Sequence, residues 1–169
     1  MAQPRPAPWW RVALIGRHPR RTLWRILALV AVCFLGREFV LLPIRIEGAS
    51  MLPAYQDGRM NAINRLAYMF HEPRRGDVVG IRLAGPRVMY LKRVVGLPGE
   101  TVAFHQGRLL INGRELEEPY VAGPCHWEIE PEQIDPDKYY VVGDNRSMPA
   151  ADHVKGQAER RRILGKILR

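Results

Sequence analysis

The chain has 169 residues, a mass of 19.4 kDa and a formal net charge of +9, so it holds one principal domain and excludes a long multidomain architecture. Hydrophobic residues make up 47% and charged residues 25%, which excludes a wholly disordered or collagen-like chain. Fifteen glycines and fourteen prolines favour many short strands over long helices, and predict a β-rich domain.

The positive charge is concentrated at the N-terminus. Residues 1–43 contain seven arginines and one acidic residue, a balance of +6, whereas the remaining residues carry only +3. A basic leader ahead of an apolar run is more typical of membrane topology than of a nucleic-acid-binding arm. We therefore expect a lipid bilayer as a partner and no nucleic acid.

The apolar run itself predicts a membrane anchor. Its uncharged part, residues 26–36, is too short to cross a bilayer as a helix, but residues 23–42 would reach about 30 Å if the charged side chains near both ends extend to the interfaces. The predicted organisation is a basic cytoplasmic segment at residues 1–22, an anchor helix at residues 23–42 and an exported domain at residues 43–169.

A cleaved secretory signal is the competing interpretation, because Ala31-Val32-Cys33 loosely matches a cleavage region. The apolar run continues past that point, which favours an uncleaved anchor. Cys33 and Cys125 are too few and too far apart to staple an exported domain, so we expect no disulfide.

After Pro43 the hydrophobic pattern changes to period two, which predicts short strands. These strands are expected at residues 44–46, 78–81, 88–95, 101–104, 109–111 and 139–142. Asn112-Gly113 is a strong hairpin signal, and Gly85-Pro86 and Pro98-Gly99 indicate further turns. The acidic, proline-bearing stretch 128–137 is expected to be a solvated loop, with no metal site because it offers no His or Cys at ligand spacing.

Three islands interrupt the strand pattern. They are EGASMLP at residues 47–53, MYLKRVVGLPGE at residues 89–100 and VGDNR at residues 142–146. Taken singly, each has an ordinary structural explanation: a serine at a strand end, a lysine facing solvent from a strand, and a turn. Together, in this order and behind a basic apolar leader, they resemble the type I signal peptidases, which are membrane-anchored Ser/Lys proteases.

The resemblance extends from Ile44 to the end of the chain and includes four further segments, at residues 57–58, 64–68, 75–79 and 163–166. It implies one N-terminal transmembrane helix followed by an antiparallel, coiled-sheet β domain with no cofactor or metal. It also implies a membrane-bound serine endopeptidase that removes signal peptides from exported preproteins at the outer face of the inner membrane. By the same match, Ser50 is the nucleophile and Lys92 is the general base.

The chemistry of such a pair requires burial of the lysine. A serine hydroxyl is a weak nucleophile until a base takes its proton, and lysine can act as that base only when neutral. Burial in apolar surroundings lowers a lysine pKa, and Lys92 is flanked by Tyr90, Leu91 and Val94. Period-two geometry also predicts that Lys92 and Arg93 face opposite ways.

The resemblance assigns supporting and substrate-binding residues as well. The expected supports are Arg93, Asp144, Asn145 and Arg146, and the residues expected to shape pockets for small side chains before the cut are Ile44, Ile46, Met51, Tyr90 and Leu91. Gly48 stands where many members have a serine that binds the oxyanion, which leaves that task to backbone N–H groups, Ser50's own among them. The segment after Arg146 also departs from the family pattern: Asp152 would replace the family's aspartate with one residue inserted, and Ser147 is the candidate for orienting the lysine.

Three alternatives compete with this prediction. A His-based triad could use His71, His105, His126 or His153, but Ser50 lacks a Gly-x-Ser-x-Gly elbow and these histidines lie in polar or turn-like segments typical of solvated rings. A conjugation-type pilin maturation peptidase would share the Ser/Lys chemistry and differ in substrate. An inactive, membrane-anchored β domain would bind a partner without cutting it.

Overall fold

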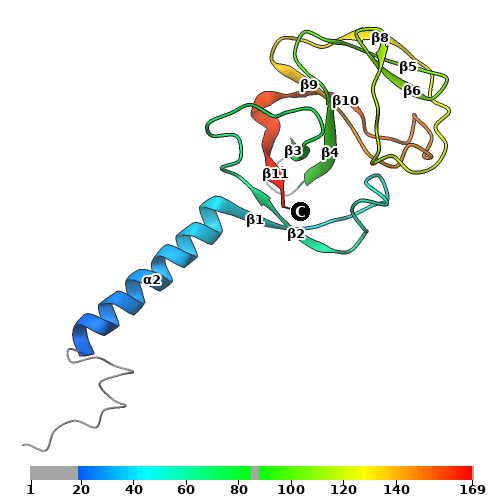
Figure 1. Ribbon diagram of the computed structural model, residues 1–169. Coiled ribbons are helices and arrows are strands. Elements are labelled where there is room, and N and C mark those ends of the chain that lie inside the picture. Colours follow the sequence, from blue (N-terminus) through cyan, green and yellow to red (C-terminus); the bar gives the residue numbers. More distant parts are fainter. Residues whose placement is uncertain (1–18, 85–87, 169) are drawn as a thin grey trace, which may run out of the picture. The chain divides into compact units, whose positions relative to one another are not determined.

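The computed structural model describes residues 19–84 and 88–168 (Figure 1). The chain divides into two compact units, Met1–Val40 and Leu41–Arg169. Of the expected elements, the turn at Gly85-Pro86 and most of the basic segment 1–22 lie outside the described residues.

The first unit contains a single described helix, α2 (Pro19–Val40). The helix begins four residues before the predicted start of the anchor, residue 23. It ends two residues before the predicted end, residue 42, because Leu41 and Leu42 already pair with the next strand. Within residues 19–84 and 88–168, no helix combines the length and the apolar character needed to cross a membrane.

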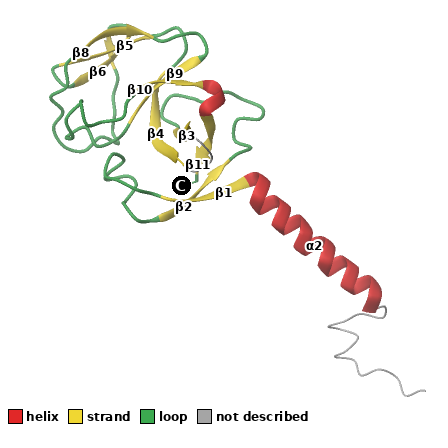
Figure 2. Cartoon of the chain, turned by 180° about the vertical axis from the view of Figure 1, so that it is seen from behind, coloured by secondary structure: helices red, strands yellow, loops and turns green. Residues whose placement is uncertain are grey.

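The second unit is mainly antiparallel β structure, as predicted (Figure 2). Its larger sheet has seven strands in the order β1-β2-β11-β3-β4-β9-β10, and every neighbouring pair is antiparallel. The bounds of these strands are β1 (Leu41–Arg45), β2 (Met60–Asn64), β3 (Val78–Ala84), β4 (Val88–Gly96), β9 (Lys138–Val142), β10 (Gly156–Glu159) and β11 (Ile163–Ile167), with a short 3-10 helix, η1 (Arg160–Arg162), before the last. The register shifts between Arg82 and Ala84 and between Val94 and Gly96, which interrupts the regular ladder on both sides of β4.

The smaller sheet has four strands in the order β7-β6-β5-β8, which are β5 (Thr101–His105), β6 (Arg108–Ile111), β7 (Arg114–Glu115) and β8 (Ile129–Gln133). The predicted hairpin at Asn112-Gly113 is confirmed, and both residues have the positive φ values, 50° and 77°, that a type I′ turn requires. The prediction of a loop over residues 128–137 is wrong for β8. Its backbone pairs with the edge of β5 although most of its side chains are exposed, so no apolar alternation marks it in the sequence.

The core of the second unit forms three clusters of buried apolar residues. The one that bears on the site consists of Ile46, Met51, Val78 and Ile167, which come from four separate segments of the chain. Met51 directly follows Ser50 and is only 2% exposed, so packing of this side chain fixes the backbone that carries the serine.

Candidate active site

Ser50 and Lys92 lie in direct contact although 42 residues separate them in the sequence. Lys92 projects from the middle of β4, and its Nζ is 2.7 Å from Oγ of Ser50, which lies in the turn after β1. Among the described residues, Ser50 is the one hydrogen-bond partner of the Lys92 amine. This is the geometry expected of a nucleophile and its base.

The surroundings of Lys92 favour its neutral form. The side chain is 2% exposed, and burial lowers the pKa of Lys92 to about 8, against a smaller opposing effect of the Asp144 carboxylate. A lysine in solution would be almost entirely protonated at neutral pH, whereas this one has a usable fraction of free amine.

The backbone around the serine is held from two sides. The N–H of Asn145 donates to the carbonyl of Ser50 at 3.0 Å, and its side-chain amide donates to the carbonyl of Ala49 at 3.0 Å. On the other side, the N–H of Gly48 donates to Oδ1 of Asp57 at 2.9 Å. Gly48 has a φ of +92°, a conformation that residues with a Cβ rarely adopt, so glycine suits this position.

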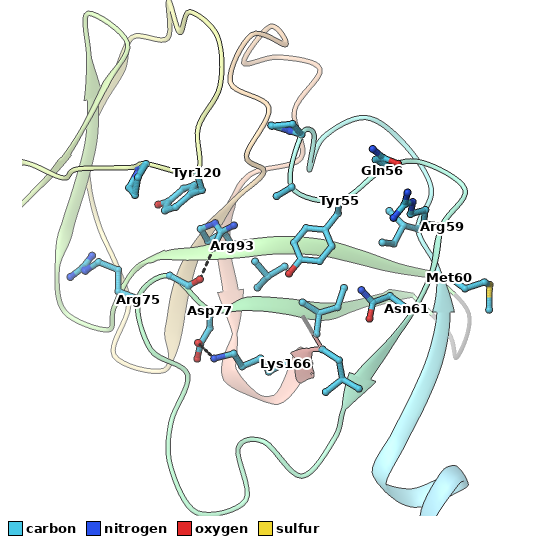
Figure 3. Close-up of a pocket in the computed structure, with 18 residues that line it drawn as sticks. Tyr55, Gln56, Arg59, Met60, Asn61, Arg75, Asp77, Arg93, Tyr120 and Lys166 are labelled. Carbon is cyan, nitrogen blue, oxygen red and sulfur yellow. Dashed lines mark hydrogen bonds and ion pairs between the residues drawn. The ribbon is translucent and has the colours of Figure 1, made fainter.

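Arg93 lies next to Lys92 on β4 and, as expected, is turned away from it. Its guanidinium forms two hydrogen bonds with the carboxylate of Asp144, at 2.7 and 2.6 Å, and donates to the carbonyl of Gly76. It also stacks on the ring of Tyr120, 3.9 Å from its centroid. Arg93 and Tyr120 line a cavity of about 900 Å³. Figure 3 shows both residues at this cavity, together with Asp77, whose Oδ1 accepts a hydrogen bond from Nζ of Lys166.

Arg146 supports the segment after β9 that also contains Asp144 and Asn145. This buried side chain donates to the carbonyl of Gly143 at 2.9 Å and pairs with the carboxylate of Glu118. Glu118 and Tyr120 were not predicted as site residues, because they lie in an irregular stretch, residues 116–128, without periodicity or a motif. A buried arginine demands an anionic partner, but the sequence does not indicate which of many carboxylates provides it.

All five residues expected to bind substrate surround a single cavity. Ile44, Ile46, Met51, Tyr90 and Leu91 line a space of about 410 Å³, together with Gly48 and Ser50. The rest of the lining is mainly apolar, with Arg45 and Glu47 as its charged residues, and Ser50 lies in the wall of the cavity.

The segment after Arg146 is not arranged as the sequence suggested. Ser147 is exposed and its hydroxyl donates to Oδ1 of Asn145 at 2.6 Å, and Asp152 is exposed. The expectation for the histidines holds for His71, His105 and His126, which are exposed. It is wrong for His153, whose ring is buried against Trp127 because this segment folds back under the site.

The described residues offer no metal site: no group of three His, Cys, Asp or Glu side chains in 19–84 and 88–168 is arranged to hold an ion.

Comparison with known proteins places the chain in a family. The model of the family described as "Signal peptidase, peptidase S26" matches residues 20–168. A signal peptidase I from Leptolyngbya laminosa is 36% identical over 153 residues, which cover 85% of this chain and 75% of the relative. A signal peptidase I from Bacillus amyloliquefaciens is 35% identical over 144 residues, covering 77% of this chain and 75% of the relative.

A crystal structure of a signal peptidase I from Enterococcus faecalis aligns with 57% of this chain and 97% of its own, at 25% identity and a TM-score of 0.47. The family match spans nearly the whole chain, and the two relatives share over a third of the aligned residues. The chain therefore belongs to the signal peptidase family, peptidase S26.

Proposed function

We propose that this chain is a serine endopeptidase that removes signal peptides from exported preproteins, with Ser50 as nucleophile and Lys92 as general base. The observation that carries the assignment is the 2.7 Å contact between Oγ of Ser50 and a buried Nζ of Lys92. Family membership and relatives named signal peptidase I support it independently.

The reaction follows from this contact. The free amine of Lys92 accepts the hydroxyl proton of Ser50 while Oγ attacks the scissile carbonyl. The resulting ammonium returns a proton to the departing amine, which leaves an acyl-enzyme on Ser50. A water molecule, deprotonated by the same amine, then hydrolyses the ester. Because Gly48 has no side-chain hydroxyl and gives its N–H to Asp57, the oxyanion relies on the backbone N–H of Ser50.

The substrate is a leader in extended conformation. The 410 Å³ cavity beside Ser50 lies between β1 and β4, and apolar side chains from both strands surround it. An extended peptide presents alternate side chains to such a cavity, so the first and third residues before the cut would enter it. The mainly apolar lining favours uncharged residues at these positions, and the resemblance to signal peptidases implies that they are small.

A membrane location is part of this proposal, with the N-terminus in the cytoplasm and the catalytic unit on the outer face. Large apolar side chains of α2 are exposed on all sides of the helix, among them Leu27, Leu29, Val30, Val32 and Phe34. Exposed apolar surface of this kind is stable in contact with lipid. The arginine-rich segment ahead of the helix favours a cytoplasmic N-terminus.

The experiment that tests the function compares the purified chain with Ser50→Ala on a leader-bearing preprotein. The wild type should release the mature protein, and the variant should lose cleavage without a change in its circular dichroism spectrum. A parallel reaction uses a pilin precursor. Cleavage of this precursor but not of the leader-bearing preprotein would favour the conjugation-type alternative. An uncut leader with folded wild type would instead support the inactive binding domain.

A further inference from the structure

His153 has a buried contact with the active-site backbone that the mechanism above does not use. Its ring is 4% exposed and lies edge-on to Trp127, with the two ring centroids 4.9 Å apart. The N–H of Gly143 donates to its Nε2 at 2.8 Å. Its Nδ1 is buried and, among the described residues, has no hydrogen-bond partner.

Gly143 connects this ring to the nucleophile. A Cβ at position 143 would lie 2.2 Å from the carbonyl oxygen of Ser50 and 2.6 Å from Nε2 of His153, so only glycine fits between them. Two residues later, the N–H of Asn145 donates to that same carbonyl of Ser50. The imidazole therefore supports one side of a backbone segment whose other side contacts Ser50.

We propose that neutral His153 is a positioning residue for the Ser50–Lys92 pair, holding residues 143–145 against the carbonyl of Ser50. This inference rests on the proposed function. Nε2 can accept the Gly143 N–H only when it carries no proton, so the neutral ring must hold its proton on Nδ1. A protonated ring has N–H groups at both nitrogens. Its Nε2–H would then face the Gly143 N–H, and two donors cannot form a hydrogen bond with each other.

The environment keeps the ring in the accepting form. Three cations face it from different segments: Lys92 on β4, Arg146 after β9, and Lys155 before β10. Burial, followed by these charges, lowers the pKa of His153 to about 4. The ring is therefore neutral throughout the range in which Lys92 loses its proton, and its hydrogen bond to Gly143 persists while the enzyme works.

The kinetic test uses the full-length protein in detergent and three variants, with kcat and KM measured on one leader-bearing substrate. His153→Leu keeps an apolar side chain against Trp127 but removes the acceptor, and should lower kcat at least tenfold while KM changes less than twofold. His153→Gln places an amide oxygen near the position of Nε2 and should restore kcat to within threefold of the wild type. The matched control His126→Leu changes an exposed histidine and should leave both parameters unchanged.

A folded His153→Leu enzyme with wild-type kcat would overturn the inference and leave the proposed function intact. Equal losses in the Leu and Gln variants would also overturn it, because they would show that the hydrogen-bond acceptor is not what matters. A wild type that leaves the leader uncut would count against the proposed function, and the next measurement would then decide the inference alone.

Nitrogen NMR of the ring requires neither activity nor a variant. Between pH 6 and 9, His153 in the wild type should show a protonated Nδ1 and an unprotonated, hydrogen-bonded Nε2. A proton on Nε2 in this range would contradict the inference. In folded variants, the amide signals of Ser50 and Asn145 should shift in His153→Leu and stay near their wild-type positions in His153→Gln, and unmoved signals in both would contradict the positioning role.

Discussion

The central residue of this protein is a lysine that is less basic than its type usually is. Two influences on Lys92 oppose each other: burial disfavours its charged form, whereas the Asp144 carboxylate favours it. Burial is the larger influence, so the pKa of Lys92 falls to about 8. The carboxylate of Asp144 accepts two hydrogen bonds from Arg93, which limits how far it can favour the ammonium form of Lys92. The pairing of Asp144 with Arg93 thus helps to keep a fraction of Lys92 in the neutral form that the proposed mechanism requires.

The pH dependence of cleavage should report this lysine. Because the free amine is the working form, kcat/KM should be low below pH 7, rise with pH through an apparent pKa near 8, and level off above it. The measurement is kcat/KM from pH 6 to 10 at constant ionic strength, with circular dichroism to confirm folding at each pH. A flat profile over this range would contradict the role of Lys92 as base.

Replacing Lys92 with arginine tests the same role without removing the charge. A guanidinium stays protonated in proteins, so Lys92→Arg should abolish cleavage as completely as Ser50→Ala. End-point cleavage of a leader-bearing substrate provides the readout. Lys138→Arg is the matched control, since Lys138 pairs with Asp135 at the surface and should tolerate the change. An active, folded Lys92→Arg enzyme would reopen the search for another base.

Among the elements, β4 organises the site because it carries two functional side chains on opposite faces. Lys92 reaches Ser50 on one face, and Arg93 on the other binds Asp144 in the segment after β9. The pair is almost completely buried, with side-chain exposures of 7% for Arg93 and 0% for Asp144. It therefore fixes the segment that contains Asn145 relative to the strand that contains Lys92.

Breaking this pair should destabilise the whole second unit. In Asp144→Asn the Arg93 guanidinium stays buried without its anion, which typically costs about 3–5 kcal/mol in the free energy of unfolding. Urea denaturation followed by circular dichroism measures the loss. As a control, Glu115→Gln breaks the Arg108–Glu115 pair, whose side chains are 67% and 51% exposed, and should cost about 1 kcal/mol or less. Similar costs for both variants would show that the buried pair has no special structural role.

The cavity between β1 and β4 should determine which leaders are cut. In the proposed function a small residue occupies the part of this cavity next to Ser50, so changing the residue before the cut from Ala to Phe should lower kcat/KM at least tenfold, about 1.4 kcal/mol of transition-state binding. The same change ten residues upstream of the cut is the control and should have little effect. Equal rates for Ala and Phe at the cut would refute the assignment of the cavity.

At the scale of the whole molecule, the two units differ in how far their apolar side chains are buried. The β unit buries them in three clusters, whereas α2 leaves most of its large apolar side chains exposed. Six of the seven arginines in residues 1–43 lie within residues 5–25, ahead of the uncharged run 26–36. This asymmetry of charge is the basis for the proposed cytoplasmic N-terminus.

A topology experiment tests the proposed location. In sealed inner-membrane vesicles of native orientation expressing the full chain, the proposed arrangement places residues 41–169 outside the vesicles. In inside-out vesicles the same residues are enclosed. Added protease should therefore degrade the β unit in the former and spare it in the latter, as shown by an antibody against the C-terminal region. Protection in native-orientation vesicles, or release of the chain by carbonate washing, would refute the membrane arrangement.

Much of the fold was predictable because it depends on local signals. Period-two alternation identified β1, β3, β4 and β9 of the large sheet and β5 and β6 of the small one, and Asn112-Gly113 identified the hairpin between β6 and β7, since both patterns act between near neighbours. The alternation did not identify β2, β10 or β11. Helix α2 was also expected from its apolar run, but its end depends on the pairing of Leu41 with Asn64 and of Leu42 with Ile63 in β2, far along the chain. The strand β8 was missed because it is held by its backbone at a sheet edge, which leaves no pattern in the side chains.

The sequence by itself determined which residues could supply the chemistry: the motifs around Ser50 and Lys92, the opposite directions of Lys92 and Arg93, and the five residues around the cavity. Only the tertiary structure decided how those residues are tuned. The depth at which Lys92 is buried, the pairing of Arg146 with Glu118 and the burial of His153 under Gly143 each join segments far apart in the sequence. Burial and electrostatic partners are properties of the packed chain, so a linear pattern of residue types cannot specify them.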